Sequence, residues 1–182
     1  VEVARELGRA LPPPRGLPFH GLDHPAGELE PYTHLAAHGI FRKYESVLLL
    51  GAGLGAAARW CHAHFGCDVT GVESQPALAA AAQHLSQRAR LAGHADFLAA
   101  RFDRLPLRDR AFTHVWGVEV FAEVAEGDAR LAELFRVVRL GGAVALQQSG
   151  AGDDWPRRAC AALRSVGFVE ARGERGERPP LN

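Results

Sequence analysis

Three glycines at alternate positions are the first residues in this chain that suggest chemistry. Gly51, Gly53 and Gly55 lie in the stretch "SVLLLGAGLGAAARW", between an apolar run and an alanine-rich run. Without a Cβ atom, glycine lets the backbone approach a ligand closely and adopt positive φ. A helix that begins behind such a turn offers unpaired N–H groups to a polar ligand. The stretch is therefore typical of a nucleotide-binding turn.

A carboxylate follows the turn at the spacing of a nucleoside site. Glu73 ends the next apolar run, "DVTGVE", about 20 residues further on, where an acid accepts hydrogen bonds from ribose hydroxyls. The glycines and this acid together indicate a nucleoside ligand. The letters "GAGLGA" also fit the dinucleotide pattern G-x-G-x-x-A, so an NAD(P)-binding module is one alternative.

Strand and helix patterns alternate around these residues. Strands are predicted at 46–50, 68–73, 95–100, 112–120, 143–148 and 168–174. The predicted helices begin after Gly55, with Ser74 as an N-cap, with Asp128 as an N-cap, and at Asp153 or Asp154. The first helix should end at Gly66 and the third at Gly141-Gly142. This alternation predicts an α/β fold with a doubly wound, mainly parallel sheet.

The chain divides into two regions. Residues 1–41 contain the run "LPPPRGLPFHGLDHPAG" and are predicted to form an N-terminal arm and a lid helix. Residues 42–182 are predicted to form a Rossmann-like domain. In such a sheet, ligands bind at the carboxyl ends of the strands, near the point where the strand order reverses.

Composition argues against several classes of partner. The 21 basic residues balance the 21 acidic ones, so no global positive field attracts nucleic acid. No apolar run is long enough to span a membrane. Cys61, Cys67 and Cys160 show no CxxC spacing, which fits buried thiols in a reducing, cytoplasmic setting. His62 and His64, two residues apart, do not share a helical face, which argues against zinc there, and no metal is predicted for the chain.

Four stretches of the chain together resemble class I S-adenosylmethionine-dependent methyltransferases. The similarity is strongest to the branch that acts on small molecules, of the ubiquinone, sterol and sarcosine types. It rests on the stretches "VLLLGAGLGAAAR", "FGCDVTGVESQPALAAAAQHLSQRARLAG", "ADFLAARFDRLPLRDRAFTHVW" and "LAELFRVVRLGGAVAL". The resemblance implies methyl transfer from S-adenosylmethionine to a small-molecule acceptor.

The resemblance also assigns roles to individual residues. The implied cofactor-binding residues are Gly51, Ala52, Gly53, Gly55, Glu73, Ser74, Gln75, Arg101, Phe102, Asp103 and Val118. Methyl transfer requires a general base only where the acceptor carries a proton that must leave. The candidates for that role are Glu119, after the fourth predicted strand, and His24 and Tyr32 in the lid region.

The chain departs from the family pattern at several polar positions. Leu49 stands where the family's turn carries a carboxylate that helps to hold the cofactor's amino group. Arg101 stands where an acid usually meets the adenine, and Asp103 is the nearest substitute. Thr113 and Leu140 replace a characteristic aspartate and proline. These changes favour a second alternative, a non-catalytic relative that acts as a structural or regulatory partner.

The C-terminal end departs from the pattern as well. The family completes its sheet with a seventh strand, but Pro179 and Pro180 argue against a central strand after residue 174. The sheet is therefore expected to lack that strand. A second copy or another chain is expected to cover the edge left open.

Overall fold

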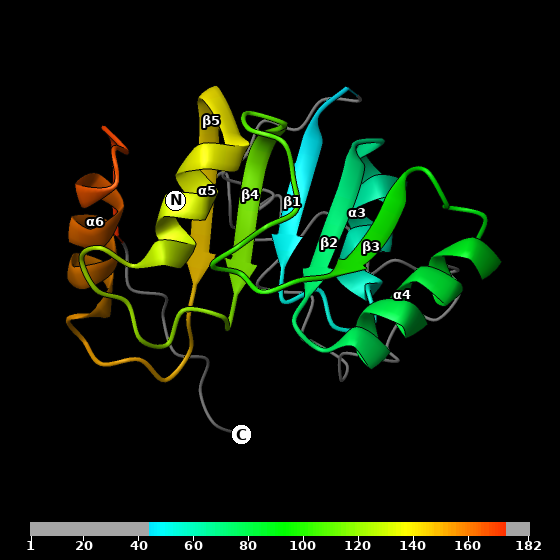
Figure 1. Cartoon of the computed structure of the whole chain (residues 1–182), viewed down its shortest axis with the longest axis horizontal. Coiled ribbons are helices and arrows are strands. Elements are labelled where there is room, and N and C mark those ends of the chain that lie inside the picture. Colours follow the sequence, from blue (N-terminus) through cyan, green and yellow to red (C-terminus); the bar gives the residue numbers. More distant parts are fainter. Residues whose placement is uncertain (1–43, 174–182) are drawn as a thin grey trace.

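A parallel sheet with helices on both faces makes up residues 44–173, the part of the chain that the computed structural model describes. Its strands are β1 (Ser46–Leu50), β2 (Asp68–Glu73), β3 (Ala95–Ala99), β4 (Phe112–Val118) and β5 (Val138–Gln147). Its helices are α3 (Ala56–Phe65), α4 (Pro76–Arg88), α5 (Ala129–Val137) and α6 (Trp155–Ser165). The strand order is β3-β2-β1-β4-β5, and every neighbouring pair is parallel (Figure 1). The predicted arm and lid helix over 1–41 lie outside the described residues.

Alternate residues of the central strand β1 feed two separate cores. Val47 and Leu49 pack with residues of α3 and α4 on one face of the sheet. Leu48 and Leu50 pack with residues of α5 and α6 on the other. A parallel sheet needs both faces covered, and a continuous apolar run is the sequence signature of such a strand. The prediction of a doubly wound α/β fold is confirmed.

Glycine and aspartate mark the helix ends as predicted in most places. α3 is flanked by Gly55 and Gly66, both in the left-handed region at φ 83° and 69°. Asp128 caps α5, because its side chain accepts the N–H of Arg130. The N-cap of α4 is Gln75 and not the predicted Ser74, since Pro76 already occupies the first helical turn.

The boundary between α5 and β5 differs from the prediction. The helix ends at Val137, and Val138 is already extended and pairs with Phe112 of β4. The next pair joins His114 to Ala143, so residues 139–142 form an irregularity inside β5. Gly141 therefore lies in this bulged segment, at φ 74°, and does not terminate the helix.

The predicted sixth strand is wrong for residues 168–173, the described part of that segment, which form no strand. The segment lies against α6 instead, where Arg164 Nη2 donates to the carbonyl oxygen of Ala171 at 2.6 Å. Phe168 meets Phe135 of α5 edge to face, with ring centroids 5.2 Å apart. The ring of Phe168 therefore packs against a helix and not in a further strand. Within residues 44–173, β5 is one of the two edge strands of the sheet.

All three cysteines are buried and reduced, as expected. The thiols of Cys61 and Cys67 lie 3.4 Å apart in the core on the α3 side. The hydrogen bond with Cys67, together with burial, raises the pKa of Cys61, and the same bond lowers the pKa of Cys67. Cys160 lies on α6, which covers the opposite face of the sheet.

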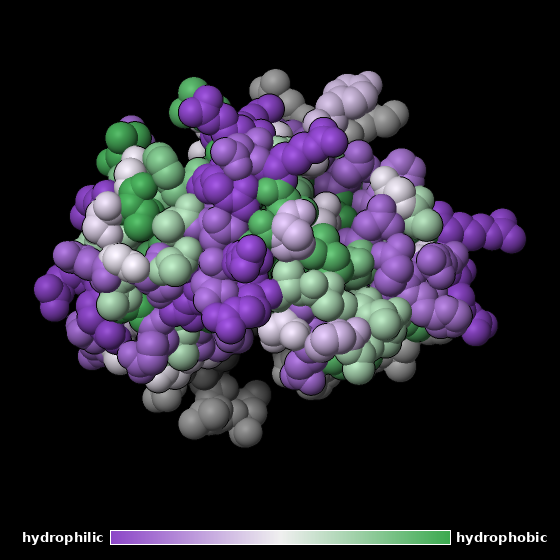
Figure 2. Space-filling model, viewed as in Figure 1, coloured by the Kyte–Doolittle hydropathy of each residue, from purple (hydrophilic) through white to green (hydrophobic). Residues whose placement is uncertain are grey.

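The outer surface is mixed in character. Figure 2 shows hydrophilic residues down the middle of one face, with apolar patches to either side. Among the helices of residues 44–173, none has the length and hydropathy needed to cross a membrane.

Candidate cofactor site

The glycine turn follows β1 at the carboxyl edge of the sheet. The strand order reverses between β1 and β4, so the turn lies at the switch point where such sheets bind ligands. Gly51, Gly53 and Gly55 all have positive φ, at 70°, 54° and 83°. The N–H groups of Gly51 and Ala52 both donate to the carbonyl oxygen of Val72, at 2.9 and 3.2 Å. These bonds tie the turn to the end of β2.

Glu73 joins the glycine turn to the start of α4. Its Oε2 accepts the N–H of Gly53 at 3.1 Å. Its Oε1 accepts the N–H of Gln75 and the hydroxyl of Ser74, each at 3.1 Å. The side chain is buried, with only 7% of the residue exposed. Because a carboxylate offers about four acceptor positions, capacity remains for one further donor, such as a hydroxyl group.

Two of the glycines make room for the protein's own side chains. A Cβ atom on Gly51 would lie 2.5 Å from Cγ1 of Val120, and one on Gly55 would lie 2.3 Å from Cζ of Phe97. Both distances are well inside van der Waals contact, so any larger residue would displace these side chains. Internal packing therefore explains these two glycines, whereas the amide of Gly53 faces the Glu73 carboxylate.

A buried arginine lies beneath the turn. Arg59 of α3 is only 1% exposed, and its Nη1 donates to the carbonyl oxygen of Leu54 at 2.7 Å. The same nitrogen lies 3.0 Å from the Cβ position of Gly55. Arg59 is not among the residues predicted from the sequence to form the site. The available signal was a charged residue between Ala58 and Trp60, in the otherwise apolar first half of the helix.

Leu49 belongs to the core. It is 1% exposed and pairs in register with Gly71 of β2 and Trp116 of β4. It packs in the same cluster as Ala52 and Trp60. The position of the family's carboxylate is thus occupied by an apolar side chain that offers no hydrogen-bond acceptor.

The loop after β3 begins beside Glu73, because the N–H of Ala100 donates to the carbonyl oxygen of Glu73 at 3.1 Å. Arg101 and Asp103 form a two-pronged ion pair in this loop, at 2.9 and 2.5 Å. Their hydrogen bonds lower the pKa of Asp103 and raise the pKa of Arg101. Phe102, between them, packs against the core on the α5 side. An adenine group would therefore compete with Arg101 for Asp103.

Arg136 of α5 anchors the rest of this loop. Its guanidinium donates to the carbonyl oxygens of Leu105 and Leu107, at 2.9 and 2.7 Å, and to both oxygens of Glu133, at 2.7 and 2.8 Å. Glu133 also accepts the N–H of Leu105 at 2.7 Å. The bonds from Arg136 lower the pKa of Glu133. The network fixes the loop after β3 to α5, and none of its hydrogen bonds was predicted from the sequence.

Glu119 is the candidate base that the described residues contain. It has φ of 58°, which is uncommon outside glycine, and such strained residues concentrate at functional sites. Its two oxygens accept the N–H of Ser149 at 2.7 Å and the Nε2 of Gln148 at 2.6 Å. The side chain is exposed and bridges the carboxyl ends of β4 and β5. His24 and Tyr32 lie outside the described residues.

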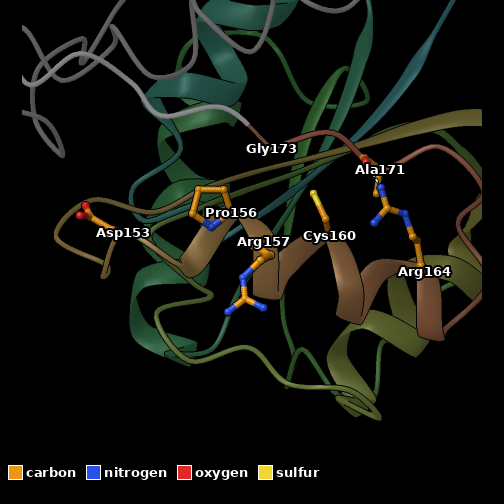
Figure 3. A pocket seen from close by; sticks show the side chains of 7 residues that line it. All are labelled: Asp153, Pro156, Arg157, Cys160, Arg164, Ala171 and Gly173. Atoms are coloured by element: carbon orange, nitrogen blue, oxygen red, sulfur yellow. Dashed lines mark hydrogen bonds between the residues drawn. The ribbon is translucent and has the colours of Figure 1, made fainter.

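Val118 is the last residue of β4, and its side chain is buried in the core on the α3 side. Its carbonyl oxygen lies 3.6 Å from the Cβ position of Gly51. The predicted residues after β1, β2, β3 and β4 thus come together at one edge of the sheet. A cavity of about 370 Å³ lies elsewhere, between α6 and residues 171–173 (Figure 3), and none of its lining residues belongs to the predicted set.

Comparison with known proteins identifies relatives of this chain. It is 24% identical to the sterol 24-C-methyltransferase of Saccharomyces cerevisiae over 115 residues, covering 63% of this chain and 30% of that protein. It is 29% identical to the chloroplastic tocopherol O-methyltransferase of Arabidopsis thaliana over 103 residues, covering 57% and 30%. The chain thus matches less than a third of the length of these curated relatives.

Solved methyltransferase structures share the fold. A methyltransferase from Aquifex aeolicus described as SAM-dependent superposes with a TM-score of 0.65 at 19% identity, covering 80% of this chain and 84% of that one. Phosphoethanolamine N-methyltransferase 2 of Haemonchus contortus, solved with phosphomonomethylethanolamine and S-adenosylhomocysteine, superposes with a TM-score of 0.60 at 17% identity, covering 75% and 36%.

A family model, described as a methyltransferase domain, matches residues 48–146, from β1 into β5. These residues include the glycine turn, Glu73 and the end of β4. The match extends over more than half of the chain, and the chain therefore belongs to the methyltransferase domain family.

Proposed function

We propose that this chain binds S-adenosylmethionine and transfers its methyl group to a small-molecule acceptor. The observation that carries the proposal is the buried Glu73 carboxylate, held against the Gly53 amide with acceptor capacity for one more hydroxyl group. The named relatives methylate sterols and tocopherol, which supports an acceptor of small size.

Different residues at the carboxyl edge of the sheet bind different parts of the cofactor. Glu73 accepts a ribose hydroxyl, while the exposed Ser74 and Gln75 lie beside the adenosine. Phe102 and Asp103 flank the adenine. The turn residues 51–55 present their backbone to the methionine part. Leu49 contributes no acceptor there, so binding at that end rests on the backbone and on the nearby positive charge of Arg59.

Catalysis then depends on position. The cofactor, when bound, would supply an electrophilic methyl group on its sulfonium: the acceptor would attack the methyl carbon in line, the carbon–sulfur bond would break, and S-adenosylhomocysteine would leave. Holding the two reactants in that geometry accounts for most of the acceleration such reactions need. Glu119, strained and exposed at the end of β4, is the residue that we expect to accept a proton from an acceptor that must lose one.

Isothermal titration with S-adenosylmethionine and S-adenosylhomocysteine tests the proposal. Binding in the micromolar range is expected for the wild type, with at least a tenfold loss in Glu73→Ala. Glu126→Gln changes an exposed glutamate between β4 and α5 and should bind normally. No heat from the wild type at millimolar ligand would refute the proposal.

A second candidate is a non-catalytic relative that serves as a structural or regulatory partner. The observation in its favour is that Leu49 is in the core and that Val120 and Phe97 fill the space beside Gly51 and Gly55. Thermal unfolding with S-adenosylhomocysteine, NAD and NADP separates the candidates, because a ligand stabilises only the folded chain that binds it. Stabilisation by none of the three, with stable association to another chain, would favour this candidate. Stabilisation by NAD or NADP alone would favour a dinucleotide-binding module.

A further inference from the structure

Two histidines and an aspartate come together at the amino edge of the sheet, opposite the glycine turn. His62 is on α3, Asp68 is the first residue of β2, and His94 directly precedes β3. One possible ligand atom from each residue lies within 4.8 Å of the other two. The rings of His62 and His94 are stacked, with centroids 4.5 Å apart and an angle of 21° between their planes. The cluster therefore joins three separate elements.

The imidazole of His62 is held in one orientation. Its Nδ1 lies 2.9 Å from the carbonyl oxygen of Cys67. Because a carbonyl oxygen can only accept, Nδ1 carries the proton and Nε2 keeps its lone pair. Metal-binding histidines show this arrangement, in which the second ring nitrogen donates to a carbonyl or carboxylate. His62 is thus prepared to act as a ligand through Nε2.

The backbone holds the other two residues in place. The N–H of Asp68 donates to the carbonyl oxygen of Glu45 at 3.0 Å, and the N–H of Val69 donates to the carbonyl oxygen of His94 at 2.7 Å. The side chains of Asp68 and His94 remain 63% and 55% exposed, so they can rotate toward an ion. The backbone of Asp68 and His94 is therefore fixed, while their side chains can move to bind an ion.

The spacing suits one small cation. Nδ1 of His94 and Oδ1 of Asp68 are hydrogen-bonded at 2.9 Å, and a bound ion would take the place of the shared proton. Two ligands of a tetrahedral ion with bonds of about 2.0 Å lie about 3.3 Å from each other. Closing the wider gaps of the cluster requires shifts of about 1.5 Å, which half-exposed side chains can make by rotation about χ1 and χ2.

We propose that His62, Asp68 and His94 bind a divalent transition-metal ion, represented by Zn²⁺, with water as the fourth ligand. Two imidazoles and one carboxylate form a donor set suited to zinc, nickel or copper, whereas calcium and magnesium prefer oxygen ligands alone. The prediction of no metal was based on His62 and His64, which lie on one helix. The partners of His62 come from β2 and the segment before β3. A bound ion would join the end of α3 to these two elements.

Titration of the tag-free full chain with ZnCl2 tests the proposal, after removal of metal by a chelator. The wild type is expected to bind one Zn²⁺ with a Kd of about 10 μM or tighter. His62→Gln, Asp68→Asn and His94→Gln should each weaken binding about 10–100-fold. His84→Gln, on the exposed face of α4, is the matched control and should bind as the wild type does. At a hundredfold excess over Kd, Zn²⁺ should raise Tm by about 5 °C or more.

Co²⁺ gives a second measurement that does not depend on the variants folding. In the wild type it should produce the strong visible absorption of a four-coordinate site, and added Zn²⁺ should remove that absorption. Three results would each overturn the proposal: no Zn²⁺ binding by the wild type, equal binding by the three ligand variants and the control, or equal competition from MgCl2. Failure of cofactor binding would leave this site untouched, since the two lie at opposite edges of the sheet.

Discussion

Replacing Glu73 by glutamine would test how the carboxylate organises the glycine turn. Both of its oxygens accept hydrogen bonds, Oε2 from the amide of Gly53 and Oε1 from Gln75 and Ser74. A glutamine has the same shape, but its NH2 group can only donate. Whichever way the amide is turned, one side of the group loses its acceptor and faces another donor.

The expected cost follows from the bonds that are lost. A hydrogen bond to a charged acceptor contributes about 1.5–3 kcal/mol, and the neutral bonds that survive are weaker. Water can replace part of the loss beside the exposed Ser74 and Gln75, so we expect the free energy of unfolding to fall by about 1.5–3 kcal/mol in total. For a chain of this size, each kcal/mol lowers Tm by about 2–4 °C. The Tm of Glu73→Gln should therefore lie about 3–12 °C below that of the wild type.

Thermal unfolding followed by circular dichroism, together with urea titration, measures this difference. Glu126→Gln, a change of the same kind at an exposed position, should shift stability by no more than about 0.5 kcal/mol. If Glu73→Gln melted within about 1 °C of this control, the carboxylate would not be holding the turn. A loss of cofactor binding in that variant would then come from a lost ligand contact alone.

Further predictions concern the core, the turn and the loop after β3. Leu49→Asp places a carboxylate in the apolar core and should lower the free energy of unfolding by about 4 kcal/mol in urea titration, without improving S-adenosylhomocysteine binding. Gly55→Ala should cost about 2–4 kcal/mol because φ is 83° and Phe97 occupies the Cβ position; Phe97→Ala in the same chain should recover part of that loss. Arg136→Gln should cost about 2 kcal/mol at neutral pH. Arg136 lowers the folded-state pKa of Glu133, so the part of this contribution that comes from their ion pair is complete above the unfolded value of about 4.3 and disappears as the pH falls through the lowered one.

Each of these predictions has a contrary outcome. A tenfold gain in S-adenosylhomocysteine affinity in Leu49→Asp would mean that position 49 still belongs to the binding site. Additive losses in Gly55→Ala and Phe97→Ala would mean that the two residues do not compete for one space. An Arg136→Gln deficit that stayed constant from pH 7 to pH 3 in urea titration would exclude the ion pair with Glu133 as its source.

Local patterns were enough to predict most of the fold. The apolar run at 46–50 could only be a strand buried on both faces, and Asp128 and Gly66 mark helix ends through their own side-chain and backbone chemistry. The end of α5 was not predictable in this way. Val138 continues the helical spacing of apolar residues, and only its pairing with Phe112, which is distant in sequence, makes it the start of a strand.

In the candidate site, too, features set by local sequence were predictable, whereas contacts between distant residues were not. Glu73 was identifiable because its distance from the glycine turn is fixed by one helix and one strand. The packing of Phe97 against Gly55 was not, since the two residues belong to different elements and meet only in the folded sheet. The cluster of His62, Asp68 and His94 was not predictable either, because the three residues belong to different elements and meet only in the folded chain.

The buried cysteines allow the rate of local unfolding to be measured by thiol labelling. Cys61 and Cys67 are 1% and 0% exposed, and Cys160 is 8% exposed on α6. A thiol-modifying reagent can reach Cys61 and Cys67 only after the surrounding structure has opened, so their labelling rates report local unfolding. Cys61 and Cys67 share one core and should be modified together, while Cys160 lines the cavity beside α6 and should react without that opening. A ligand that slows the modification of Cys61 and Cys67 would thereby be shown to stabilise the side of the sheet that α3 covers.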